Sequence, residues 1–139
     1  MRKLASVQRV LEKKRIVGAD KIEAYRVNGW WVVDKKDAYK VGDLVVYCEV
    51  DSWIPHTLAP FLTKPGHSPR EYLGVKGERL RTVKLKGQLS QGLLLPLVEG
   101  NSEEGQDPLE EGQDFSEILG ITKWEDTRYM NDSNAKGSF

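Results

Sequence analysis

Short apolar runs separated by frequent turn residues constrain the fold of this 139-residue chain more than any other feature. The runs are rich in Val, Ile, Leu, Tyr and Trp, and Gly, Asn, Asp or Pro separates them. This pattern is typical of a small all-β sandwich or barrel. The predicted strands cover residues 6–16, 22–27, 30–34, 44–50, 79–86 and 92–98. The first of these also matches a helix face, because Leu4, Val7 and Leu11 have helical spacing.

Two local signals refine this prediction. The pair Asn28-Gly29 lies between two runs and predicts a tight hairpin, because both residues tolerate positive φ. Residues 115–119 predict a short helix, with Asp114 as its N-cap and Gly120 at its C-terminal end. We therefore expect a mainly all-β domain with one or two short helices, the other one within the connection at 52–77.

Three segments lack strand patterns. Residues 52–77 contain four of the six prolines and predict a long connection, and such connections are usually functional or mobile. Residues 99–114 contain seven Asp or Glu and predict a solvated acidic loop. Residues 126–139 are polar and predict the start of a linker, which leaves residues 1–125 as the domain.

Composition excludes several classes of protein. Lysine plus arginine and aspartate plus glutamate number 21 each, so no net charge attracts the chain to nucleic acid or membrane. Cys48 is the only cysteine and lies in an apolar run, which predicts a buried, inert thiol. No apolar run reaches the roughly 20 residues that span a bilayer, and the N-terminus has no signal-peptide pattern. We expect a cytoplasmic protein without a membrane partner.

No residue pattern predicts catalysis. His56 and His67 lie in the proline-rich connection without a cysteine partner, which predicts no metal site. Lys35-Lys36-Asp37-Ala38 is similar to the Lys-x-Asp-Gly motif of covalent nucleotidyltransferases, but the glycine is missing. The segment also has the character of a loop between strands. We therefore expect no catalytic residue, no cofactor and no enzymatic activity in this chain alone.

A cluster of cations is the strongest candidate for a binding site. Arg79, Arg81, Lys84 and Lys86 follow one another in a predicted strand, and the first two alternate in the opposite phase to the last two. A β-bulge near Thr82 would bring all four onto one face. Such a face could bind phosphate, or it could keep a sheet edge soluble. Lys64 and Arg70 in the long connection are the next candidates for a contact with nucleic acid.

Aromatic residues support a contact with nucleic acid. Tyr25, Trp30, Trp31, Tyr39 and Tyr47 precede the basic run, and rings beside a basic groove are how OB-folds hold single-stranded bases. Each ring could equally belong to the core. Strand alternation predicts that Trp30 and Trp31 point to opposite sides, but it does not say which is exposed.

The chain resembles the N-terminal domain of the Deinococcus-type RNA ligases of bacteria, phages and some protists. The resemblance depends on the order and spacing of short segments along almost the whole chain. These segments are residues 2–8, 18–23, 27–33, 39–47, 49–52, 80–97 and 119–125. The resemblance implies an OB-fold-like barrel followed, in the whole ligase, by an ATP-dependent nucleotidyltransferase domain that uses ATP and Mg. No catalytic residue can be carried over, because the motif with the lysine nucleophile is absent here.

The resemblance further implies an accessory RNA-binding domain. It would position a nicked duplex while a catalytic domain in the same parent chain joins 3′-OH and 5′-phosphate RNA ends. One alternative is a tRNA-binding OB module unrelated to ligation, because Ala19-Asp20-Lys21 matches a turn of those modules. Another is a structural barrel that binds protein through residues 52–77.

Overall fold

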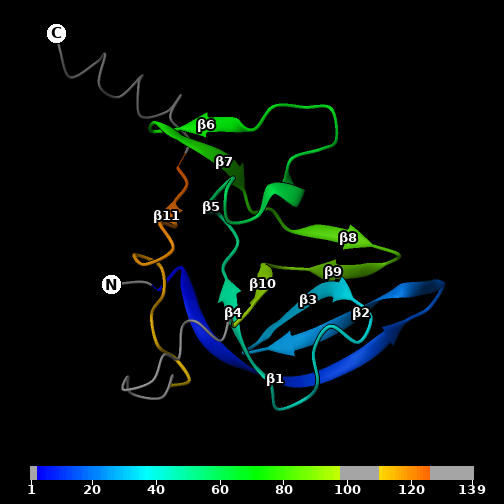
Figure 1. Cartoon of the computed structure of the whole chain (residues 1–139). Helices are drawn as coiled ribbons and strands as arrows, with labels where there is room; N and C mark the ends of the chain where they lie inside the picture. The colour runs from blue at the N-terminus through cyan, green and yellow to red at the C-terminus, as the bar shows by residue number, and fades with distance from the viewer. Residues whose placement is uncertain (1–2, 98–109, 126–139) are drawn as a thin grey trace, which may run out of the picture.

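The structure, a computed structural model, describes residues 3–97 and 110–125, and these residues form short strands with a single turn of 3₁₀ helix (Figure 1). The strands are β1 (Ala5–Ile16), β2 (Ala19–Val27), β3 (Trp30–Lys35), β4 (Leu44–Cys48), β5 (Ser52–Pro55), β6 (Arg70–Tyr72), β7 (Val75–Arg79), β8 (Val83–Leu85), β9 (Gln88–Ser90), β10 (Leu93–Pro96) and β11 (Thr122–Lys123). The 3₁₀ turn is η1 (Pro60–Leu62). The mainly all-β prediction is therefore confirmed.

A five-stranded antiparallel sheet in the order β10-β4-β1-β2-β3 forms the barrel. β1 pairs with β4 through its first half and with β2 through its second half, and its register with β2 shifts between Val10 and Glu12. Such an irregularity bends a strand, so β1 can serve both halves of the curved sheet. β3 lies beside the segment that contains β9, where Gln91 N donates to Trp31 O (2.9 Å) and Val33 N donates to Ser90 Oγ (2.9 Å).

A long segment between β4 and β10 forms two further pieces of sheet. β5, β7 and β6 pair in that order, with β11 on the outer side of β5, and β8 pairs only with β9 (Figure 1). Gly77 allows β7 to approach β5, since a Cβ at this position would lie 2.0 Å from the carbonyl oxygen of Ile54. We call residues 49–92 the insertion, because they separate two neighbouring strands of the barrel sheet.

Buried side chains form two hydrophobic clusters. One is made by barrel strands and their connections and contains Val10, Tyr25, Val27, Val32, Tyr39, Val45, Tyr47 and Leu94. The other joins the barrel to the insertion and the C-terminal segment, and it includes Val46, Cys48, Ile54, Leu80, Phe115 and Ile121. The second cluster anchors one end of the insertion to the barrel.

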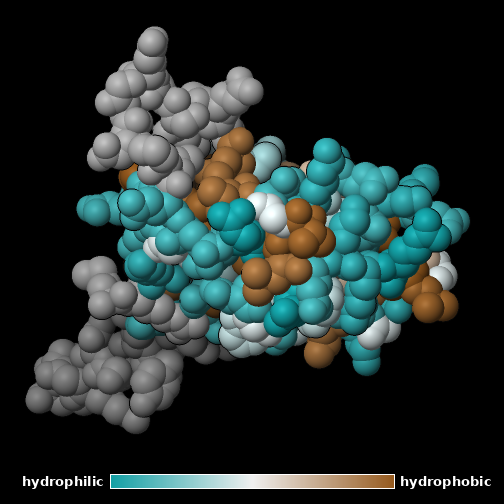
Figure 2. Space-filling model, turned by 90° about the horizontal axis from the view of Figure 1, so that it is seen from below, coloured by the Kyte–Doolittle hydropathy of each residue, from teal (hydrophilic) through white to brown (hydrophobic). Residues whose placement is uncertain are grey.

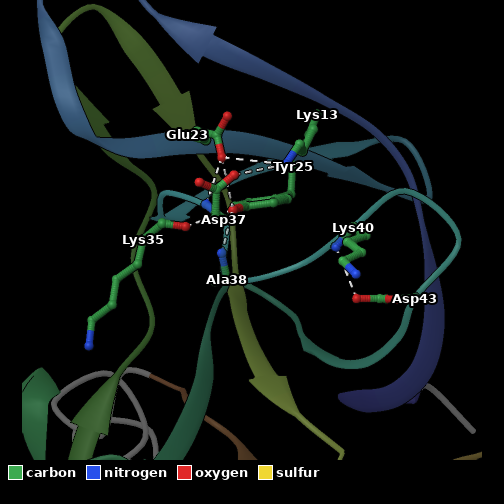
Figure 3. A network of polar contacts seen from close by, with 8 residues as sticks. All are labelled: Lys13, Glu23, Tyr25, Lys35, Asp37, Ala38, Lys40 and Asp43. Carbon is green, nitrogen blue, oxygen red and sulfur yellow. Dashed lines mark hydrogen bonds and ion pairs between the residues drawn. The ribbon is translucent and has the colours of Figure 1, made fainter.

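A polar network fixes the connection between β3 and β4 (Figure 3). The Tyr25 hydroxyl donates to Lys35 O (2.6 Å) and accepts from Ala38 N (3.1 Å), and the buried Glu23 carboxylate accepts from Asp37 N (2.8 Å). Lys13 Nζ lies 3.7 Å from Glu23 and 3.3 Å from Asp37. The Lys35-Lys36-Asp37 segment is thus the end of a strand and a turn, as predicted, and its backbone is held by the barrel.

The structure confirms some local predictions and corrects others. The first predicted strand is a strand, and Asn28, at φ 55°, lies in the tight turn between β2 and β3. Residues 115–119 form hydrogen-bonded turns rather than a helix, although Asp114 Oδ1 accepts from Ser116 N (2.9 Å) as a cap does. Residues 98–109 and 126–139, which include most of the predicted acidic loop and the whole predicted linker, lie outside the described residues.

Two predictions about longer segments were wrong. The connection at 52–77 contains β5, η1 and β6 and the start of β7, because strands of three to five residues leave no clear alternation in a sequence rich in proline and glycine. The predicted strand at 79–86 is not one strand with a bulge near Thr82. β7 ends at Arg79 and β8 begins at Val83, and the two belong to different sheets.

None of the helices in the described part of the chain has the length and apolar character needed to cross a membrane.

Candidate nucleic-acid interface

The insertion and β3 enclose an open cleft of about 850 Å³. Its lining comes from η1 and the connection to β6, which we call one wall, from residues 79–85, which we call the other wall, and from Val33 and Asp34 of β3. The segment that bears both walls joins the fourth and fifth strands of the barrel in chain order. OB-folds bind oligonucleotides with this loop and with the neighbouring strands 2 and 3. The cleft therefore lies where nucleic acid binds to this architecture.

The structure brings together four of the six cations that the sequence predicts to contact RNA. Lys64, Arg70, Arg79 and Arg81 line the cleft, whereas Lys84 and Lys86 do not. Lys84 lies in β8 between Val83 and Leu85, which line the cleft, so alternation directs it to the opposite face of the hairpin. Lys86 lies in the turn of the same hairpin at φ 50°. The cations therefore do not share one strand face.

Arg79 holds other parts of the protein together. Its Nε and Nη2 atoms lie 2.8 and 2.7 Å from Asp51 Oδ1, and its guanidinium carbon lies 3.8 Å from the centroid of the Trp124 ring. Trp124 N in turn donates to Asp51 O (2.8 Å). Because these contacts join β7, the β4–β5 connection and the C-terminal segment, Arg79 is the predicted site residue least available to a ligand.

The other cations of the cleft are more accessible. The Arg70 side chain is 72% exposed, and its Nε atom lies 3.9 Å from Glu78 Oε1, which is a loose ion pair. Lys64 and Arg81 are exposed and form no ion pair within the described residues. The lining also contains Asp34, Glu71 and Glu78, so four cations are offset by three carboxylates. Desolvation raises the pKa of the Asp34 carboxyl.

The β8–β9 hairpin with the two residues that precede it, residues 81–90, is the most basic part of the interface. We call it the basic hairpin. It contains Arg81, Lys84 and Lys86, and the sequence has no Asp or Glu from residue 80 to residue 97. Val83, Leu85 and Leu89 are 46, 41 and 49% exposed, so the hairpin also presents apolar side chains on both faces. A two-stranded ribbon with exposed cations and apolar side chains is suited to a ligand that is anionic and partly apolar.

The aromatic residues have separate roles. Tyr25, Tyr39 and Tyr47 are buried in the barrel core, which excludes them from stacking with bases. Trp30 is 43% exposed, and Trp31 is partly exposed with Lys14 Nζ 4.4 Å from its ring centroid, so neither is buried. Other aromatics line the cleft, namely Trp53, Phe61, Tyr72 and Trp124. Phe61 is 67% exposed, and sequence reasoning missed it because it lies in the connection rather than in a barrel strand.

The described residues provide neither a metal site nor an accessible thiol as an alternative to the cleft. They contain no group of three or more His, Cys, Asp and Glu side chains that could hold a metal ion. His56 Nδ1 lies 3.4 Å from the Thr63 hydroxyl, which connects it to the local fold. Cys48 is buried, and burial raises the pKa of its thiol to about 12.

The exposed apolar side chains of the molecule are not limited to the cleft. Figure 2 shows the face seen from below, which is mostly hydrophilic with hydrophobic residues near its centre and at its edges. Leu11, Val17 and Val41, in β1 and in the connections on either side of β2 and β3, are 42, 95 and 59% exposed. Cations accompany these residues too, but Lys13 lies 3.7 Å from Glu23 and 3.3 Å from Asp37, and Lys14 lies over the Trp31 ring, so the cleft remains the better candidate.

Comparisons with known proteins agree with the architecture. Residues 4–97 match a family model described as an OB-fold domain. The chain belongs to this OB-fold family. The barrel sheet, the insertion and all residues that line the cleft except Trp124 lie within the matched residues. No match was found among curated proteins.

Solved structures of Naegleria gruberi RNA ligase are similar to the chain. A mutant with AMP and Mn is 45% identical, with a TM-score of 0.76 over 89% of this chain and 36% of that one. The ligase with PPi is 44% identical, with a TM-score of 0.77 over 91% and 36%, and an apo mutant is 42% identical, with a TM-score of 0.78 over 90% and 36%. The predicted OB-fold and its resemblance to RNA ligases are confirmed, and the chain spans 36% of the ligase length.

Proposed function

We propose that the chain is the accessory RNA-binding domain of an RNA ligase and that it holds RNA ends for a separate catalytic domain. One observation carries this proposal. Three cations, in a stretch of sequence without Asp or Glu from residue 80 to residue 97, lie on a hairpin at the edge of a cleft, at the position where OB-folds bind oligonucleotides. The 45% identity to an RNA ligase supports RNA as the nucleic acid and a role in joining ends.

The residues of this chain support a role in RNA binding and not in the chemical step. Arginine and lysine on the basic hairpin neutralise phosphates and fix the position of the backbone, which gives affinity without sequence information. The chemical step, which uses ATP and a divalent metal, is assigned to the part of a longer ligase that this chain does not match. The absence of adenylyl transfer by this chain alone stays a prediction, as do a nicked duplex as the substrate and a cytoplasmic location.

Salt-dependent binding tests the proposal. Lys84→Ala/Lys86→Ala should weaken binding of the whole chain to a nicked RNA duplex and flatten the plot of log K against log salt by about one to two units. A matched control is Lys21→Ala/Lys40→Ala, which removes two exposed cations outside the basic hairpin and should change the affinity and the salt slope less. Fluorescence anisotropy at several salt concentrations measures both quantities. If the two double variants had the same affinity and the same salt slope, the basic hairpin would only keep the sheet edge soluble and would not contact RNA.

The two alternatives predict other outcomes of the same titration. A tRNA-binding module would bind tRNA more tightly than a nicked duplex of equal length. A protein-interaction barrel would bind neither RNA, and its cleft would remain available in the presence of excess nucleic acid. No observation in the structure or the comparisons favours either alternative over RNA ligase.

A further inference from the structure

We propose that the cleft holds an unpaired nucleotide whose base stacks on Phe61, while its flanking phosphates lie against Lys64 and Arg81. This inference rests on the proposed function and deepens it. It names the part of an RNA substrate that enters the cleft, which is an unstacked base rather than a paired duplex.

Phe61 lies on a rigid support. It is the central residue of η1, where Leu62 N donates to Ala59 O (3.1 Å) and Thr63 N donates to Pro60 O (3.2 Å). Ala59 is 2% exposed and packs in the core, and the Thr63 hydroxyl donates to Glu78 Oε2 of β7 (3.0 Å). Both sides of the turn are therefore anchored, while the Phe61 ring between them is 67% exposed and lines the cleft.

The other wall also has exposed apolar side chains. Val83 and Leu85 of the basic hairpin line the cleft and are 46 and 41% exposed, and Val33 and Leu93 contribute further apolar surface. Side chains of this kind gain nothing from a phosphate, and a duplex presents mainly its phosphates and sugars to a protein. The face of an unstacked base is flat and apolar, and aromatic side chains are the usual platforms for it.

The charges give the nucleotide an orientation. Asp34, Glu71 and Glu78 line the cleft and disfavour phosphates among them. Lys64 and Arg81 are exposed and form no ion pair with any described carboxylate, and they lie on the two walls. A nucleotide satisfies both conditions when its base lies inside the cleft and its phosphates lie outside, against Lys64 and Arg81. The carboxylates are then available as acceptors for exocyclic amino groups of the base, as Asp and Glu are for cytosine.

Substitution of the ring tests this inference. Phe61→Ala in the whole chain should weaken binding to a short single-stranded RNA by about 5- to 150-fold, the range for loss of one stacked base. The salt slope should not change, because no charge is lost, and binding to a blunt RNA duplex should change little. Phe61→Trp should retain the affinity, and its fluorescence should respond to the single strand. Ile118→Ala, which truncates a residue that is 74% exposed and does not line the cleft, is the matched control.

The outcomes separate this inference from the proposed function. Wild-type affinity of Phe61→Ala for the single strand, or an equal loss on the blunt duplex, would overturn the stacking site. If Lys84→Ala/Lys86→Ala still weakened binding in that case, the RNA-binding function would stand without it. If neither RNA bound the unmodified chain, both proposals would be wrong, and a peptide-like segment of a protein partner would become the occupant to test. Circular dichroism of each variant verifies the fold.

Discussion

The barrel sheet and the insertion differ in how they place their apolar side chains. In the barrel, Tyr25, Val27 and Val45 are 0% exposed, and they belong to one hydrophobic cluster within the five-stranded sheet. In the insertion, Phe61, Val83 and Leu85 are 67, 46 and 41% exposed around a cleft. Buried side chains supply most of the stability of a domain, and exposed apolar side chains beside charges mark binding surfaces. The comparison therefore assigns stability to the barrel and recognition to the insertion.

Gly77→Ala should have the largest effect on the insertion. A Cβ at this position would lie 2.0 Å from the backbone carbonyl oxygen of Ile54, so β5 and β7 must separate. We expect a loss of about 3 kcal/mol or more in the free energy of unfolding, at the upper end for overpacking, because a backbone atom cannot move aside as a side chain can. Chemical denaturation measures this.

The control for that substitution is Gly29→Ala, where an added Cβ meets nothing within 4 Å. Its stability should stay close to that of the wild-type protein. Hydrogen exchange of the backbone amides would compare the local stability of the insertion with that of the barrel. In Gly77→Ala the amides of β5 and β7 should lose protection before those of β1 and β2, and simultaneous loss in both sheets would mean that barrel and insertion are one cooperative unit.

Tyr25→Phe should have a smaller effect, and one confined to the barrel. The substitution keeps the ring in the core but removes a hydroxyl that donates to Lys35 O and accepts from Ala38 N. We expect a loss of about 1–3 kcal/mol in stability, because these buried backbone groups lose a partner. The Ala38 amide should exchange faster, while RNA affinity measured by anisotropy stays unchanged. A drop in affinity equal to that of Lys84→Ala/Lys86→Ala would contradict the separation of the two regions.

Cys48 gives a smaller, pH-dependent effect. Burial raises the pKa of its thiol from 9.0 to about 12, so the folded protein favours the neutral thiol. The stability from this difference is complete below pH 9.0 and is lost progressively as the pH rises toward 12, since the unfolded chain releases the proton first. Alkylation by iodoacetamide at pH 8 should be slow in the native protein and fast in urea. Cys48→Ala should lose less stability between pH 9 and pH 11 than the wild-type protein.

Sequence patterns predicted the barrel better than the insertion for a physical reason. The strands β1 to β4 have five to twelve residues, which is long enough for alternation and turn residues to define them. The strands of the insertion have three to five residues, and two of them, β8 and β9, pair only with each other. Alternation cannot be recognised in so few residues, so β5, β6 and the start of β7 were predicted as connection, and the last residue of β7 was predicted in one strand with β8.

The candidate site was predicted in part. The cations were found because charge is a property of the sequence, and four of them line one cleft. The ion pair of Arg79 with Asp51 could not be predicted, because it depends on a contact between residues 28 positions apart. Phe61 was missed because an exposed ring and a buried ring look alike in sequence. Both errors concern tertiary contacts, which local patterns do not encode.

The location of bound RNA on the surface tests the central claim most directly. Titration of the isotope-labelled chain with a short RNA, followed by amide chemical shifts, reports which residues the RNA approaches. We expect the largest changes at residues 61–70, beside the cleft, and at residues 81–90, the basic hairpin, with small changes in β1 and β4. Changes concentrated on β1 and β4, or no changes at RNA concentrations that saturate a related full-length ligase, would contradict the assignment of recognition to the insertion.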